Sequence, residues 1–233
     1  MPRFLLTVLL LLPLLTRADD SHYGYQPPSR DGIGKTYMTR EISHVMGHRG
    51  AAWLERPSRE REERTDLLLD ALPIRDGDVV ADLGAGSGYF SLPIAKRVGS
   101  GRVLAIDIQP EMLDLIRQRS SADNIQNIDT VLATVSDPKI PSSSVDLLLL
   151  VDAYHEFSHP REVMQGVMEG LVPGGKVILV EYRAEDPRVP IKPLHKMTEQ
   201  QAKRELEAVG FNFVENLRSL PQQHILVFRK PLT

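Results

Sequence analysis

The sequence predicts a single α/β domain built on a doubly wound, Rossmann-like sheet with helices on both faces. Three apolar runs, at 79–83, 102–107 and 145–151, have the continuous character of parallel strands covered on both faces. Helical patterns alternate with these runs, which is the arrangement that produces a mostly parallel sheet. The 233 residues suffice for one large α/β domain, and the sequence has no internal repeat and no sign of a second domain.

The remaining elements continue the alternation of strand and helix patterns. Further strands are expected at 129–133, 176–182, 211–216 and 224–229, and helices at 59–72, 89–98, 110–120, 159–171 and 198–209. Pro110 suits a first helical turn, and Thr198 with Gln201 fits a capping box. The last two strands read as a hairpin-like pair that closes the chain.

The N-terminus reads as an addition to this domain. Residues 1–18 carry an early Arg3 and a short apolar run, the pattern of a secretory signal that would export the protein to the periplasm or the exterior. The alternative is an uncleaved membrane anchor; no stable membrane span is expected if the signal is cleaved. Residues 19–40 are polar and rich in Gly and Pro and are expected to be a flexible lead-in. Residues 41–72 are expected to form a helical lid, and 73–233 the α/β domain itself.

Composition excludes several classes of function. The net charge is −3 with acidic and basic residues interspersed, so no basic field is available for nucleic acid. The absence of cysteine excludes disulfides, thiolate nucleophiles and thiolate metal sites, and it suits a reducing or an oxidising compartment equally.

The stretch VVADLGAGSGYF (79–90) predicts a ligand-binding turn between a strand and a helix. Asp107 ends the next strand about 20 residues later, where an acid reaches the ribose hydroxyls of a bound nucleotide. The glycine spacing differs from the dinucleotide fingerprint, because Tyr89 and Phe90 stand where its third glycine belongs. Asp82, inside the strand end, suits a ligand with an ammonium group better than a pyrophosphate. The turn therefore indicates an adenosine-containing ligand other than a dinucleotide.

Four motifs in order resemble those of class I S-adenosylmethionine-dependent methyltransferases: VVADLGAGSGYF, VLAIDIQPEML, VDLLLLVDAYHEF and LVPGGKVILVEY. The nearest group is the ubiquinone/menaquinone-biosynthesis-like small-molecule methyltransferases. The resemblance covers roughly residues 60–230. It implies a seven-stranded sheet with six parallel strands and the last one antiparallel, and S-adenosyl-L-methionine as the cofactor.

The resemblance also implies roles for residues of the cofactor site. Gly84, Ala85, Gly86 and Gly88 would line the methionine part of the cofactor, with Asp82 beneath them. Asp107 would bind the ribose and Ile108 would contact the adenine. Thr134 stands where an acid that meets the adenine amino group is common, and Asp137 is the nearest alternative. Asp152 completes the cofactor-binding set.

The segment VDAYHEFSHP (151–160) should face the reacting methyl group, because ligands bind outside the carboxyl ends of parallel strands. His155 is the candidate general base, since histidine is half-ionised near neutral pH. Tyr154 would shape the catalytic pocket with Asp152, and Glu156 would orient the imidazole. The alternative is that His155 fills the pocket wall or caps the next helix.

Two further segments are expected near the substrate. His195, in PIKPLHKMT (190–198), is a candidate substrate contact or else a solvent-facing histidine. Trp53 is expected to anchor the lid and to contact substrate. His44 and His48 are four residues apart, as metal ligands on a helix would be, but no third ligand is fixed by the spacing, so no metal is predicted.

Taken together, the motifs predict transfer of a methyl group from S-adenosylmethionine to an unidentified small molecule. The alternative function is a non-catalytic module or partner protein that binds S-adenosylmethionine or S-adenosylhomocysteine. The sequence does not specify the acceptor atom or the oligomeric state.

Overall fold

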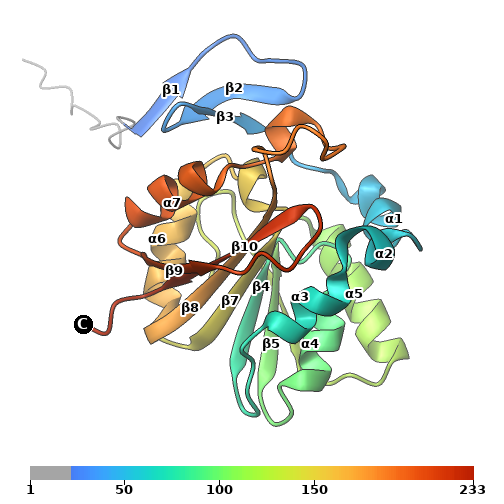
Figure 1. Ribbon diagram of the computed structural model, residues 1–233. Helices are drawn as coiled ribbons and strands as arrows, with labels where there is room; N and C mark the ends of the chain where they lie inside the picture. The colour runs from blue at the N-terminus through green and yellow to red at the C-terminus, as the bar shows by residue number, and fades with distance from the viewer. Residues whose placement is uncertain (1–21) are drawn as a thin grey trace, which may run out of the picture.

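The computed structural model describes residues 22–233, so the export signal predicted for residues 1–18 lies outside the described residues. A large sheet with helices on both faces forms the body of the protein, and a small sheet lies above one edge of it (Figure 1).

The large sheet has seven strands in the order β6-β5-β4-β7-β8-β10-β9. Their bounds are β4 Val79–Leu83, β5 Arg102–Asp107, β6 Ile128–Leu132, β7 Val145–Val151, β8 Leu171–Tyr182, β9 Asn212–Asn216 and β10 Gln223–Arg229. The strands from β6 to β8 are parallel, and β10 pairs antiparallel with both β8 and β9. β9 therefore runs with the parallel strands, which confirms the predicted sheet of six parallel strands and one antiparallel strand.

Helices cover both faces of the large sheet (Figure 1). α3 (Thr65–Ala71), α4 (Ser91–Arg97) and α5 (Pro110–Ala122) lie on one face, and α6 (Pro160–Gly170) and α7 (Glu199–Glu207) on the other. Alternate residues of β7 pack into the two cores: Leu148 and Leu150 on the α6 side, Leu147 and Leu149 on the α4 side. This double burial explains the uninterrupted apolar run of that strand.

The small sheet corrects the expected flexible lead-in over residues 19–40. Within the described part of that range, β1 (Tyr23–Tyr25) and β2 (Gly32–Tyr37) pair antiparallel, and β3 (Arg40–Ser43) pairs with β2. Tyr37 and Ile42 are fully buried, so the sheet has apolar contacts that its polar composition conceals.

The helix expected over 59–72 is two helices. α2 (Arg59–Glu63) ends where Arg64 adopts a left-handed conformation, with φ 55°, and α3 begins at Thr65. The Arg64 guanidinium pairs with Asp66 at 2.8 Å across this break. Before α2 lie the one-turn helices η2 (His48–Gly50) and α1 (Ala51–Leu54).

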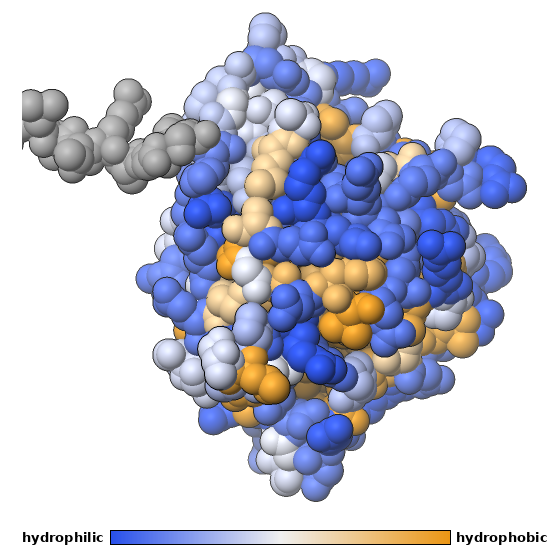
Figure 2. All heavy atoms as spheres, turned by 60° about the vertical axis from the view of Figure 1, so that its left-hand side comes forward, coloured by the Kyte–Doolittle hydropathy of each residue, from blue (hydrophilic) through white to orange (hydrophobic). Residues whose placement is uncertain are grey.

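Hydrophilic side chains predominate on the face shown in Figure 2, with apolar side chains in small patches between them. Among residues 22–233, no helix has the length and apolar character needed to cross a membrane.

Candidate functional site

A cavity of about 470 Å³ opens at the carboxyl ends of β4, β5 and β7. This volume lies within the range of small-molecule sites, and the position is where open α/β sheets bind ligands. Predicted site residues that line it are Gly84, Gly86, Asp107, Ile108, Thr134, Asp152, His155, Glu156, His195 and Trp53.

The glycine turn presents bare backbone to this cavity. Gly84 and Gly86 have φ values of 76° and 54°, which favour glycine because other residues meet steric strain there. A Cβ on Gly86 would lie 2.6 Å from the Leu54 side chain, and one on Gly84 would lie 2.7 Å from Ala153. The turn therefore needs glycine both for its conformation and for the close approach of its neighbours.

Asp107 fixes this turn and also faces the cavity. Its Oδ2 accepts a hydrogen bond from the Gly86 N–H and its Oδ1 from the Gln109 N–H, both at 2.9 Å. Burial raises the pKa of this carboxyl, against the lowering effect of these backbone hydrogen bonds. A carboxylate has about four acceptor positions, so Asp107 can still accept from a hydroxyl donor in the cavity.

Three residues predicted to contact the cofactor lie behind the turn rather than at the cavity wall. Ala85 packs in the core with α5, and a Cβ on Gly88 would lie 2.9 Å from Ile116 of that helix. The Asp82 carboxylate is buried and accepts a hydrogen bond from the Ser91 hydroxyl at 2.6 Å. Burial raises the pKa of Asp82 to about 6. These residues shape and support the turn.

On the adenine side, Thr134 lines the cavity and its hydroxyl accepts a hydrogen bond from the Asp137 N–H at 3.0 Å. The Asp137 carboxylate pairs with Lys139 at 2.6 Å. Ile108 is partly exposed at the cavity wall.

His155 is held by a carboxylate that the sequence reasoning missed. It lies on η3 (Tyr154–Glu156) and is 2 % exposed. Its Nδ1 lies 2.6 Å from Oε2 of Glu181, and its backbone N–H donates to Oε1 of the same residue at 3.2 Å. Burial disfavours the charged imidazole, but Glu181 outweighs this effect and raises the pKa of His155.

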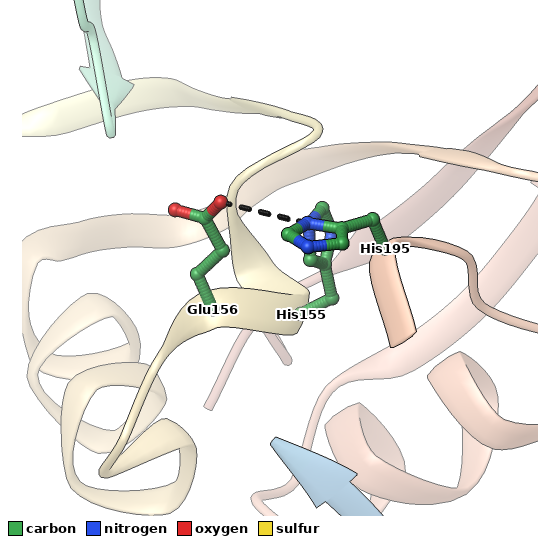
Figure 3. Close-up of side chains that lie close together, drawn as sticks. All are labelled: His155, Glu156 and His195. Atoms are coloured by element: carbon green, nitrogen blue, oxygen red, sulfur yellow. Dashed lines mark hydrogen bonds and ion pairs between the residues drawn. The ribbon is translucent and has the colours of Figure 1, made fainter. Parts of the chain in front are cut away.

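His155 belongs to a cluster with His195 and Glu156 (Figure 3). Its Nε2 lies 3.1 Å from Nδ1 of His195, which is on η4 (Pro193–His195). Oε1 of Glu156 lies 3.9 Å from Nε2 of His155 and 3.8 Å from Nδ1 of His195. Burial raises the pKa of Glu156 to about 7, whereas burial and the neighbouring His155 lower the pKa of His195. Two rings and a carboxylate therefore meet at the cavity wall.

Tyr154 does not lie on the catalytic face as predicted. Its ring is fully buried in the core beside Phe157, because the turn of η3 that exposes His155 to the cavity directs Tyr154 inward. Asp152 does reach the cavity. Gln223 donates to its Oδ2 at 2.7 Å, and its buried Oδ1 has no partner among the described residues. Burial and the nearby Glu63 raise the pKa of Asp152.

The segment 45–63 covers one side of the cavity. The Met46 N–H donates to Oε2 of Glu156 at 3.1 Å, and the His48 N–H donates to Gln109 at 2.7 Å. Trp53 lines the cavity but is 53 % exposed and stacks on the Arg56 guanidinium, so it is not the buried anchor that was expected. Leu54, against Gly86, makes the close contact instead.

Beneath this segment lies a buried ionic group that the sequence reasoning also missed. Glu63 accepts hydrogen bonds from Arg56, Arg59 and Tyr182, at 2.5, 3.0 and 2.9 Å. The sequence does contain a signal for the other missed carboxylate, Glu181. This charged residue lies at the end of the apolar run of β8, and it is fully buried.

His44 and His48 do not form the metal pair considered from the sequence. His44 follows β3, whereas His48 begins η2, so no continuous helix aligns them. Glu41, in the same stretch of chain, accepts hydrogen bonds from the backbone N–H groups of Ser29 and Gly34.

Comparison with known proteins bears directly on this cavity. The model of the methyltransferase domain family matches residues 80–175, which include the glycine turn, Asp107 and the His155 segment. Over these residues the chain is similar to the class I S-adenosylmethionine-dependent methyltransferases. This family similarity implies S-adenosylmethionine as the cofactor.

Methyltransferases and methyltransferase-like proteins match about half of this chain. An uncharacterised methyltransferase-like protein of Schizosaccharomyces pombe is 31 % identical over 126 residues, which are 54 % of this chain and 46 % of that protein. The ubiquinone/menaquinone biosynthesis C-methyltransferase of Hydrogenovibrio crunogenus is 30 % identical over 111 residues, 47 % of this chain and 44 % of the relative. The matched region thus spans less than half of either relative.

A solved structure shows the same fold. The S-adenosylmethionine-dependent methyltransferase of Aquifex aeolicus superposes with a TM-score of 0.75 at 20 % identity, over 80 % of this chain and 100 % of that one.

The residues at the cavity fit the family's cofactor. Asp152 Oδ1, a buried acceptor without a partner among residues 22–233, suits an ammonium group, and the free lone pairs of Asp107 suit ribose hydroxyls.

Proposed function

We propose that this protein transfers a methyl group from S-adenosylmethionine to a small-molecule acceptor in the cavity, and that His155 and His195 remove the acceptor proton. One observation carries the proposal: the glycine turn, Asp107 and the two histidines line the same cavity. A positioned base next to a cofactor site is what methyl transfer to a protonated acceptor requires.

The cofactor would lie across the carboxyl ends of β4 and β5. Asp107 would bind the ribose, Ile108 and Thr134 would contact the adenine, and Asp152 would accept the ammonium group. S-adenosylmethionine supplies an already activated methyl group, so the protein's task is to align the acceptor with it and to exclude water. The segment 45–63 serves this second purpose as a lid.

Proton transfer follows from the hydrogen bonds of the histidine pair. Because Glu181 accepts from Nδ1 of His155, that nitrogen carries the proton and Nε2 of His155 is an acceptor. His195 then donates from Nδ1 to this Nε2, which leaves Nε2 of His195 with a free lone pair. His195 thus receives the acceptor proton, and His155 with Glu181 stabilises the charge that results.

The proposed role predicts a separation between turnover and cofactor affinity. In chelator-treated protein, His155→Gln and His195→Gln should each lower methyl transfer by roughly 10²–10⁴-fold with little change in S-adenosylmethionine affinity. The measurement is S-adenosylhomocysteine production with a panel of phenols, amines and carbon acids, alongside calorimetric titration of the cofactor. His48→Gln, an exposed histidine outside the pair, is the matched control.

An equal fall in turnover and cofactor affinity would assign both histidines a structural role. Tight cofactor binding without transfer to any acceptor class would contradict the enzymatic function and favour a non-catalytic binding module.

A further inference from the structure

We propose that His155, Glu156 and His195 form a binding site for a divalent transition-metal ion such as Zn²⁺, with an open coordination position facing the cavity. The three side chains come from η3 and η4, and their donor atoms converge (Figure 3). The inference stands on this geometry and does not depend on methyl transfer.

The separations of the donor atoms match the size of a metal ion. Nε2 of His155, Nδ1 of His195 and Oε1 of Glu156 are 3.1, 3.8 and 3.9 Å apart. Three atoms so spaced lie on a circle with a radius of about 2.1 Å, the length of a Zn–N or Zn–O bond. An ion at the centre of the triangle would thus contact all three without movement of the backbone.

Each of two ligands already has the outer partner that metal ligands usually require. Glu181 accepts from Nδ1 of His155 at 2.6 Å, which directs the lone pair of Nε2 toward the cluster. A carboxylate behind a metal-binding histidine fixes its tautomer and raises its basicity. The Met46 N–H occupies Oε2 of Glu156 at 3.1 Å and leaves Oε1 for the ion.

The donor set selects the class of metal. Two imidazoles and one carboxylate suit Zn²⁺, Fe²⁺, Co²⁺ or Ni²⁺, whereas Mg²⁺ and Ca²⁺ prefer oxygen ligands alone. Three protein ligands at a cavity wall leave a position for water or for an acceptor oxygen, as in catalytic rather than structural zinc sites. All three residues line the cavity.

Metal binding and proton acceptance exclude each other at this site. Coordination through Nδ1 of His195 requires the proton on that nitrogen to move to Nε2, and the hydrogen bond from Nδ1 to His155 Nε2 is then lost. An ion would therefore replace the proton-accepting pair by a Lewis acid beside the acceptor.

The test is calorimetric titration of the purified full-length chain, stripped of metal by chelator, with Zn²⁺, and visible absorption spectroscopy with Co²⁺. One equivalent should bind with a dissociation constant of about 1 µM or tighter. His195→Ala and Glu156→Gln should each weaken binding at least about tenfold, and Glu181→Gln roughly 10–100-fold. His48→Ala, which removes an exposed histidine outside the cluster, should leave the affinity unchanged.

Cofactor titration of the same variants shows whether they fold and separates this proposal from methyl transfer, since the proposed cofactor contacts do not include these three ligands. No Zn²⁺ binding below about 100 µM, or unchanged affinity in His195→Ala and Glu156→Gln, would overturn the site. Loss of binding in His48→Ala instead would assign the ion to the N-terminal segment and equally overturn it.

Discussion

Buried carboxylates dominate the electrostatics of single residues around the cavity. Desolvation raises the pKa of Asp82, Asp107, Asp152 and Glu156. Each is therefore more costly to ionise in the folded protein than in water, which destabilises the fold near neutral pH. Such groups gain from a positively charged ligand, and S-adenosylmethionine carries an ammonium and a sulfonium.

The cost of ionising the buried Asp82 carboxyl should make the stability of the protein depend on pH in a way that can be measured. Its pKa in the folded protein is about 6, above the ordinary value of 3.8, so the folded state holds its proton longer than the unfolded state. Stability from this group is therefore complete below about pH 4 and is lost as the pH rises through about 6. Asp82→Asn should raise the free energy of unfolding by about 1–3 kcal/mol at pH 7.5, and by much less at pH 4.

Urea denaturation at both pH values measures the effect, with Asp129→Asn, an exposed carboxylate on β6, as the control. A stabilisation of equal size at pH 4 and pH 7.5 would show that Asp82 ionisation is not its cause.

The structure brings together those predicted site residues that lie at or just after the end of a strand. The ends of β4, β5 and β7 meet at one edge, so Asp107, Asp152 and His155 could be assigned to one site from strand positions alone. Glu181 was missed because it lies 26 residues from His155, and nothing in the sequence encodes their contact. Tyr154 was misplaced because the one-turn helix η3 sends neighbouring side chains in opposite directions.

Among the elements, the glycine turn and α5 depend on each other. Gly88 has φ +80°, and an added Cβ would lie 2.8 Å from Leu92 and 2.9 Å from Ile116. Gly88→Ala should therefore lower the free energy of unfolding by about 2–4 kcal/mol, from backbone strain and overpacking together.

The matched control is Gly47→Ala, because a Cβ at Gly47 meets nothing within 4 Å. Guanidinium denaturation of both variants measures the difference. Equal stability of the two variants would contradict the packing argument.

The sequence predicted the long elements well and the short ones poorly. A long apolar run such as β7 can be recognised as a buried strand from the sequence. β1 has only three residues and β3 four, which are too few to show the alternation of apolar and polar residues that indicates a strand. The break between α2 and α3 was also missed, since the left-handed conformation of Arg64 has no residue signal comparable to glycine.

For the molecule as a whole, a buried ion pair joins the small sheet to the large domain. Arg40 of the small sheet binds Glu205 of α7 through two hydrogen bonds, at 2.7 and 2.9 Å, and also donates to the His155 carbonyl at 3.2 Å. Glu205 is fully buried. The small sheet is thus tied to the catalytic face.

Arg40→Met should cost about 3–5 kcal/mol of stability, because it leaves the Glu205 carboxylate buried without a positive charge beside it, with the Gln201 amide still donating to it. The double variant Arg40→Met/Glu205→Met should recover most of this loss, as measured by guanidinium denaturation. A double variant no more stable than Arg40→Met would show that the ion pair is not the source of the effect.

The central claim is that the cavity binds S-adenosylmethionine through Asp107, and calorimetric titration of the full chain tests it most directly. S-adenosylmethionine and S-adenosylhomocysteine should bind at micromolar concentration, and NAD should not bind. Asp107→Ala should weaken binding of the adenosyl ligands by about tenfold or more, because the ribose loses its hydrogen-bond acceptor and the Gly86 N–H loses its partner. Asp129→Ala should bind like the unmodified protein. No binding of either adenosyl ligand, or unchanged affinity in Asp107→Ala, would contradict the assignment of this cavity as the cofactor site.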